Sequence, residues 1–438
     1  MRDYLLMGVF IACLPFAIRH TYAAVLLWTW IGIMNPHKLA WGFALNFPFA
    51  AGAAGVAMLS MIFTKDRISM PKSPALIALI ILVIWMCLTT AFAFHPDGSF
   101  EQLKKVLKIQ LMTLVALAAL QERKHIELFI WVNAISLGFY GFKGGLFTIA
   151  TGGSSRVWGP SGGFIEGNNE IGLALVMAIP LMNYLRAVSV RPVIRNGLII
   201  LMFLSAVAVL GTQSRGAFLA IGAMGFVLWM RSDKKFASGV IILFAAAALL
   251  AFMPDAWEQR MRSIQNYEQD TSAMGRINAW WFTVNIANSR LLGGGFDIYT
   301  PDLFAFYAPN PLDIHVAHSI YFSILGEHGY IGLFLFLLLW VLAFKIAQNI
   351  RREAGSRPET KWAFYLAGMC QVSLVGYAVG GAFLSLAYFD LPYNILIVLI
   401  VLQRWLREKR WENEREGAFG ASTLSEQKPT RSKIMASG

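Results

Sequence analysis

Charged side chains are scarce in this sequence of 438 residues. Asp, Glu, Lys and Arg together make up 14% of the chain, whereas hydrophobic residues make up 57%. A soluble globular protein carries about 25% charged residues. The shortage of charge therefore excludes an ordinary soluble domain and indicates a polytopic membrane protein.

Cysteine is also rare. The chain has three cysteines, Cys13, Cys87 and Cys370, and each lies inside an apolar run. Cysteines in such runs behave as small hydrophobic residues, so no disulfide framework is predicted. The sequence also lacks the Cys and His spacing of a metal site.

Apolar runs of about 20 residues, long enough to cross a hydrocarbon core of roughly 30 Å, recur along most of the chain. The clear runs lie at about 42–63, 74–94, 106–120, 126–150, 170–186, 196–212, 215–230, 236–253, 319–344, 362–388 and 391–406. Residues 3–34 are also apolar, but Pro15 and the pair Arg19-His20 interrupt them. They count either as one broken span, giving twelve, or as two short ones, giving thirteen. The sequence thus predicts an all-α protein with about 12 transmembrane helices, in the range 11–13.

Basic residues gather in alternate loops. Most of the 37 Lys and Arg residues lie near positions 65–72, 123–124, 186–195, 231–235 and 345–361 and in the tail after 404. Cytoplasmic loops of membrane proteins carry an excess of Lys and Arg, so these loops and the C-terminal tail are predicted to be cytoplasmic. The net charge of +12 therefore needs no nucleic-acid partner.

This orientation divides the chain into four parts. They are N-terminal transmembrane helices over 1–253, an extracytoplasmic loop over 254–318, C-terminal transmembrane helices over 319–406 and a cytoplasmic tail over 407–438. The tail is polar and is expected to be disordered.

Two outer loops stand out. The loop 254–318 is the long one, and 255–268 and 272–288 within it look helical. A glycine-rich loop covers 151–169, where Asn168 or Asn169 is a suitable cap for the following helix.

Two histidines stand where the long loop meets the next apolar run. His315 and His318 are three residues apart, which would place them on one face of a helix. The positive end of a helix dipole disfavours imidazolium, so a histidine at a helix start stays neutral and can accept a proton. We expect His318 to act as a general base. The alternative is that both histidines lie half wet at the membrane interface.

Several basic residues lie in outer segments, against the charge bias: Arg156, Arg215, Arg260, Arg262, Arg276 and Arg290, with Lys104, Lys105 and Lys108 at the edge of one apolar run. Arg215 stands between two adjacent runs, where it either snorkels to water or faces a cavity and clamps a phosphate. Arg276 is a second candidate, with an exposed loop charge as its alternative. Arginines near a neutral histidine suggest a lipid-linked substrate whose departing diphosphate they would stabilise.

Glu327 is a less suitable partner for His318. Nine residues of unbroken helix make about 2.5 turns, which puts the two side chains on opposite faces and about 13.5 Å apart along the axis. Glu327 is therefore expected to be structural, unless Gly326, Gly329 and Gly332 kink the helix.

The order of these motifs resembles the O-antigen ligase/polymerase superfamily. The resemblance rests on Ser214-Arg-Gly-Ala217, on the long outer loop, and on His318-Ser319 followed by Glu327-x-Gly-x-x-Gly-Leu333. His328 departs from the Leu that commonly follows this glutamate. The segment from Arg260 to Trp280 is similar to a bacterial subgroup of O-glycosylation ligases associated with the exosortase system. The resemblance covers roughly residues 150–400.

The resemblance implies a glycosyltransferase of the bacterial inner membrane that uses neither a metal nor another cofactor. An O-antigen ligase takes a glycan from undecaprenyl diphosphate and joins it to a sugar hydroxyl of lipid A-core, on the periplasmic side, in lipopolysaccharide biosynthesis. The family's essential histidine corresponds to His318, and its essential arginines correspond to Arg215 and Arg276. We expect Arg156, Asn169 and His315 to bind substrate as well.

Three alternatives stay open. Two of them belong to the superfamily: a polymerase that extends the carrier-linked glycan and a ligase that glycosylates protein Ser or Thr. The sequence does not separate these from an O-antigen ligase, because acceptor choice depends on cavity shape. A transporter or flippase of lipid-linked sugars belongs to a different class and would place ionisable groups near the middle of the membrane. Here these groups collect on one side, which favours surface chemistry.

Overall fold

The protein is described by a computed structural model that covers residues 1–232, 234–237, 239–240, 243–244, 247 and 271–412. Within these ranges the chain is helical and has no β-strand, which confirms the all-α class. The helix predicted at 255–268, much of the span at 236–253 and most of the tail lie outside the described residues.

The described α-helices are α1 (Arg2–Arg19), α2 (Thr21–Met34), α3 (Phe49–Phe63), α4 (Pro74–Ala91), α5 (Pro96–Ala119), α6 (Arg123–Ala150), α7 (Asn168–Val188), α8 (Pro192–Gly211), α9 (Arg215–Met230), α12 (Thr271–Ser289), α13 (Pro301–Tyr307), α14 (Ile320–Ala354), α15 (Lys361–Gly381) and α16 (Asp390–Arg407). Short 3₁₀ turns η1 (Pro36–Leu39), η2 (Phe43–Leu45), η4 (Pro358–Thr360) and η5 (Arg410–Glu412) connect or follow them. Five helical stretches in the described part of the chain are long and apolar enough to cross a membrane: Pro74–Ala91, Asn168–Val188, Pro192–Gly211, Ile320–Ala354 and Pro358–Gly381. The larger number of spans stays a prediction.

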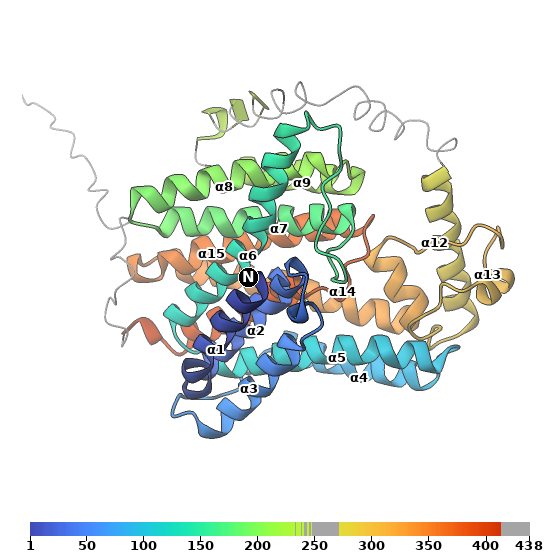
Figure 1. Cartoon of the computed structure of the whole chain (residues 1–438), viewed down its shortest axis with the longest axis horizontal. Helices are drawn as coiled ribbons and strands as arrows, with labels where there is room; N and C mark the ends of the chain where they lie inside the picture. The colour runs from blue at the N-terminus through green and yellow to red at the C-terminus, as the bar shows by residue number, and fades with distance from the viewer. Residues whose placement is uncertain (233, 238, 241–242, 245–246, 248–270, 413–438) are drawn as a thin grey trace, which may run out of the picture.

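The helices form a bundle with two different ends (Figure 1). We call the end at which α16 finishes the tail end. The opposite end, which carries residues 151–167 and 290–319, is the loop end. In Figure 1 the helices α12 and α13 lie beyond the bundle on the right, at the loop end. α16 is the central helix, because almost every residue from Asp390 to Leu406 is buried.

Residues 3–34 fold as a hairpin of two helices. The backbone turns at His20, whose Nδ1 lies 3.1 Å from Asp66 Oδ1. At the other end, Asp3 Oδ1 accepts hydrogen bonds from the amides of Gly42 (3.0 Å) and Ala44 (3.1 Å). Of the two alternatives for this segment, the structure therefore has two short helices. Pro15 lies inside α1 and does not end it.

Helix α14 is broken at Gly329, as the glycine pattern allowed. Gly329 has φ 67° and ψ −172°, a conformation that is essentially restricted to glycine. The break frees two carbonyls of the preceding turn. The amide of Gly294 donates to Gly326 O (2.9 Å), and the amide of Gly295 donates to Glu327 O (2.8 Å). The turn at 291–296 is thus inserted into the broken helix and satisfies its backbone.

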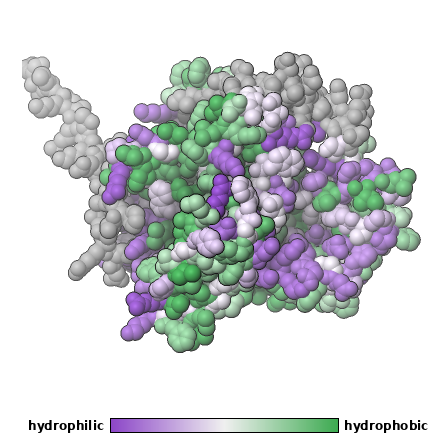
Figure 2. All heavy atoms as spheres, in the orientation of Figure 1, coloured by the Kyte–Doolittle hydropathy of each residue, from purple (hydrophilic) through white to green (hydrophobic). Residues whose placement is uncertain are grey.

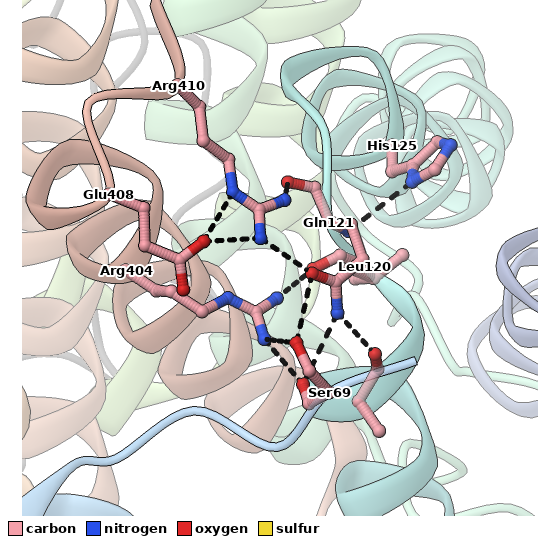
Figure 3. Close-up of polar contacts among 8 residues, drawn as sticks. Ser69, Leu120, Gln121, His125, Arg404, Glu408 and Arg410 are labelled. Carbon is pink, nitrogen blue, oxygen red and sulfur yellow. Dashed lines mark hydrogen bonds and ion pairs between the residues drawn. The ribbon is translucent and has the colours of Figure 1, made fainter. Parts of the chain in front are cut away.

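Two arginines of the C-terminal region hold the tail end together (Figure 3). Arg404 donates to the carbonyls of Ser69 (2.6 Å) and Leu120 (2.5 Å). Arg410 donates to the carbonyl of Gln121 and, at 2.9 Å, to its Oε1. Leu120 is the residue at which α5 ends, so its carbonyl has no partner within that helix. The guanidinium groups supply the missing donors.

Arg404→Ala is expected to lower the free energy of unfolding by about 2–3 kcal/mol, because carbonyls held by a charged donor are left without a partner. Thermal unfolding in detergent measures the effect. Arg407→Ala is the matched control, since Arg407 is exposed on the same helix turn and should change stability by less than about 0.5 kcal/mol. Equal unfolding temperatures for the two variants would contradict the bracing role.

Candidate active site

Helix α12 holds the irregular segment between α13 and α14. Asn278 Nδ2 donates to the carbonyls of Asn310 and Asp313, both at 2.9 Å, and its Oδ1 accepts from the amide of Asn310 at 2.8 Å. Asn285, about two turns further on the same helix face, donates to Tyr307 O at 2.8 Å. These amides satisfy backbone groups that the segment cannot pair by itself.

Trp280 holds the backbone of Ala317, the residue that precedes His318. Its Nε1 donates to Ala317 O at 2.7 Å, and its ring stacks on Phe322 with centroids 4.8 Å apart. The neighbouring Trp281 is 56% exposed instead. The sequence analysis gave neither tryptophan a role. The period of 3.6 residues per turn is the signal that separates them, because it points adjacent side chains of α12 about 100° apart.

The expectation that His315 and His318 share a helix face is wrong. α14 begins at Ile320 with Ser319 as its N-cap, so both histidines precede the helix. His318 has φ 44°, in the left-handed region. The hydrogen bonds from Asn278 and Trp280 occupy the carbonyls of Asp313 and Ala317, which a helix would need for its own first turns.

A cavity of about 520 Å³ nevertheless brings the two histidines together at the loop end. It is lined by Ser272, Met274, Arg276, Asn310, Leu312, Asp313, His315 and His318. His315 Nε2 lies 2.8 Å from Asp313 Oδ1. Three side chains that the sequence singled out, Arg276, His315 and His318, therefore face one space.

The environment of His318 keeps its imidazole neutral. Burial, followed by the nearby charges of Arg276 and His315, lowers the pKa of His318 to about 4. Its Nδ1 is buried and has no hydrogen-bond partner among the residues that the structure describes. The ring is thus unprotonated above about pH 5, so it can accept a proton.

Arg276→Gln is expected to raise the pKa of His318 from about 4 toward the usual value of about 6.5, since removing a nearby positive charge favours imidazolium. The rise should be partial, because burial contributes more than Arg276. NMR titration of isotope-labelled histidine measures it. Arg290→Gln is the control, because Arg290 donates to Phe92 O and has no part in the His318 shift. An unchanged or lower pKa in Arg276→Gln would contradict this electrostatic coupling.

Arg215 lies at the start of α9 and is not among the described residues that line the cavity. Ser214 caps this helix by accepting from the amide of Ala217 at 3.2 Å. Gly216, which follows Arg215, is packed against Phe383. The ring centroid of Phe383 is 6.4 Å from that of Trp280. The start of α9 is therefore linked through Phe383 to Trp280, which holds the segment that carries His318.

The loop 151–167 joins this α9 start. Arg156 Nε donates to Gln213 Oε1 at 3.3 Å, two residues before Arg215. The predicted cap of α7 is wrong, because Gly167 is the N-cap and Asn168 and Asn169 are already helical. Asn168 instead donates to Thr212 O at 2.8 Å, where α8 ends.

The beginning of α7 lies close to the cavity. Arg276 acts electrostatically both on His318 and on Glu170, the residue that follows Asn169. The structure thus places the six predicted site residues in two neighbouring groups at the loop end. Arg276, His315 and His318 line the cavity, and Arg156, Asn169 and Arg215 surround the α7 and α9 starts.

Glu327 pairs with Tyr388 in the described contacts, and not with His318. Tyr388 Oη donates to Glu327, and it lies 2.9 Å from His328 Nε2. His328 Nδ1 is 2.7 Å from Thr89 Oγ1. This buried chain ties α14 to α4 and to the start of α16. In the described ranges, no group of three or more His, Cys, Asp and Glu side chains is placed to hold a metal ion.

Comparison with protein families gives two matches. Residues 1–190 match a family of unknown function, DUF5935, and residues 200–337 match the family described as O-antigen ligase. No curated protein matches the chain. The exosortase-associated subgroup is not part of these matches and stays a prediction. The second match includes Arg215, Arg276, His315 and His318, and this O-antigen ligase domain at residues 200–337 supports assignment of the chain to the O-antigen ligase superfamily of membrane enzymes.

Proposed function

We propose that the protein is an O-antigen ligase of the bacterial inner membrane. It would transfer a glycan from undecaprenyl diphosphate to a sugar hydroxyl of lipid A-core, without a metal or other cofactor. The observation that carries this proposal is the cavity in which the buried, neutral His318 lies beside the charge of Arg276.

The distribution of basic residues supports a periplasmic cavity. The loops that precede α4, α6 and α15 meet at the tail end, where Arg404 and Arg410 bind Ser69 and Gln121 and where Arg357 lies over the Trp411 ring. Nine of the 37 Lys and Arg residues lie in or directly beside these loops, at positions 65–72, 123–124 and 351–361. An excess of basic residues marks the cytoplasmic side, so the loop end and its cavity would face the periplasm.

The chemistry is a displacement at the anomeric carbon. His318 takes the proton of the acceptor hydroxyl while that oxygen forms a bond to the anomeric carbon. The bond from this carbon to the diphosphate oxygen breaks, and its electron pair leaves with the diphosphate. Arg276 and Arg215 stabilise the charge that develops there. Attack opposite the leaving group inverts the anomeric configuration.

Binding of the glycan donor would also raise the pKa of His318, the general base. A diphosphate beside Arg276 cancels the positive charge that lowers the His318 pKa in the free protein. The imidazole then becomes a stronger base when the donor is present. His315, held by Asp313, would contribute donor contacts from the same cavity, and Arg156 and Asn169 would do so from the α7 side.

The test is transfer by the purified full-length protein, supplied with undecaprenyl-diphosphate glycan and lipid A-core, with a chelator and without nucleotide. The expected product is glycan on lipid A-core. A glycan ladder on the carrier lipid would instead identify a polymerase, and glycan on protein a protein ligase. If the donor stays intact in every mixture but crosses vesicles that contain the protein, the transferase proposal is wrong and transport replaces it.

A further inference from the structure

A second cavity, of about 340 Å³, opens at the loop end and shares no lining residue with the first. It is lined by Trp28, Gly32, Asn35, Gln102, Lys105, Lys108, Ile109, Gly162, Gly163, Phe164, Ile165, Phe389 and Asp390. It therefore lies between α2, α5, the loop 151–167 and the start of α16. None of these residues takes part in the proposed transfer chemistry.

The rim of this second cavity is basic. Gln102, Lys105 and Lys108 recur every three residues and so share one face of α5. Lys38 adds a third ammonium group. Gly162 lines the cavity, and a β-carbon built on this glycine would lie 3.4 Å from Lys38 Nζ. Lys104 differs from them, since it pairs with Glu101 and lies over the Phe100 ring.

The inner part of the second cavity is acidic and aromatic. Asp390 is the first residue of α16 and is only 9% exposed. Its Oδ1 approaches α2, because a β-carbon built on Gly32 would lie 3.5 Å from it. Asn35 adds a side-chain amide, whose Nδ2 donates to Gly32 O at 2.9 Å. Trp28 and Phe389 supply flat apolar walls. A carboxylate and amides at the centre of a basic rim suit a ligand with hydroxyl groups as well as negative charge.

The depth of the second cavity points to a lipid headgroup. Lys105 and Lys108 come just before the apolar part of α5, so the cavity lies where this helix changes from polar to apolar. Figure 2 shows hydrophilic atoms gathered in the middle and right of this face, beside the hydrophobic surface of the helices. Lysine ammonium groups at this level can pair with the phosphate oxygens of a lipid headgroup.

We propose that the second cavity binds the phosphorylated sugar headgroup of the lipid that accepts the glycan. The lysines bind the phosphate, while Asp390, Asn35 and Gln102 bind sugar hydroxyls. A bare phospholipid headgroup would leave Asp390 facing a phosphate of the same charge, and a neutral sugar would leave the lysines unused. This assignment rests on the proposed ligase function, and it specifies where the acceptor is held.

The position of the second cavity fits two lipids held side by side. The segment between α15 and α16 lines the second cavity and also contacts Trp280, which holds the segment that carries His318. Phe383 lies beside Trp280, which fixes the His318 segment, and Phe389, six residues later, lines the second cavity. An acceptor anchored at Asp390 would thus extend its sugars along this segment toward the first cavity.

The experiment measures equilibrium binding of lipid A, a bisphosphorylated glucosamine disaccharide lipid, to the full-length protein in a neutral detergent. No donor is present, and the His318→Ala background prevents transfer. The double variant Lys105→Gln/Lys108→Gln is expected to weaken binding about 10-fold or more, since each charged contact is lost. Lys104→Gln is the matched control and should bind like the parent. Lys105→Arg/Lys108→Arg keeps the charges and should retain binding.

Two further probes separate the possible ligands. Phosphatidic acid should bind more weakly than lipid A, and Asp390→Asn should weaken the binding of lipid A but not that of phosphatidic acid. Millimolar inorganic phosphate should not displace lipid A. The proposal is overturned if the double lysine variant binds lipid A like the parent, if phosphatidic acid binds as tightly, or if free phosphate displaces the lipid. Lysine-dependent lipid A binding, combined with no glycan transfer by the protein that retains His318, would instead refute only the proposed function.

Discussion

His318→Ala is expected to reduce glycan transfer to lipid A-core by about 10²–10⁴-fold, the usual contribution of a positioned acid–base group. The buried imidazole is neutral at the working pH, and alanine offers no atom to take the hydroxyl proton. Donor binding should persist, because Arg276 and His315 remain. The loss should therefore appear in kcat more than in the affinity for the donor.

The measurement is initial-rate transfer with purified variants of equal thermal stability. His318→Asn is the better second variant, because asparagine tolerates the left-handed backbone that His318 adopts and still provides no base. His95→Ala is the matched control, since His95 also lies at the loop end but contacts Thr300 and Asp302 outside the cavity. A folded His318→Asn protein with full activity would rule out the histidine as base.

Gly329→Ala is expected to prevent stable folding of the α14 region. A β-carbon on Gly329 would lie 2.3 Å from Leu291 O, and the backbone conformation alone costs a non-glycine residue about 1–3 kcal/mol. The contact is with backbone, so no side-chain rotation relieves it. The inserted turn at 291–296 would have to leave the helix break and would expose the carbonyls of Gly326 and Glu327.

The yield of monodisperse protein and its unfolding temperature in detergent measure this effect. Gly222→Ala is the control, because Gly222 is inside α9 with nothing within 4 Å of its β-carbon position. That variant should be at least as stable as the parent, since alanine favours helix. Similar yields and unfolding temperatures for Gly329→Ala and Gly222→Ala would show that the break is not required.

Local sequence patterns predicted the helices well and the site only in part. The length of the apolar runs was enough to predict α4, α7 and α14, because a membrane span is defined by length and composition. The helical spacing of His315 and His318 misled, because contacts from α12 decide the local backbone. Those contacts come from residues 35 and 37 positions away, and local spacing carries no record of them.

The capping prediction at Asn168 failed for a similar reason. Asparagine is a good N-cap, and the rule considers only the helix that follows. In the fold a different helix end, at Thr212, lies within reach and takes the amide. The second cavity was equally invisible, because it is assembled from four segments between Trp28 and Asp390. The sequence analysis identified Lys105 and Lys108 only as basic residues in an outer segment, at the edge of one apolar run.

The hairpin of α1 and α2 returns the chain to the end of the bundle at which α1 starts. Asp3 is bound by the amides of Gly42 and Ala44 at the loop end, whereas Arg410 is bound to Gln121 at the tail end. If the axis of the bundle crosses a membrane, reagents that label a residue beside Asp3 would approach from the side opposite to those that reach Arg410.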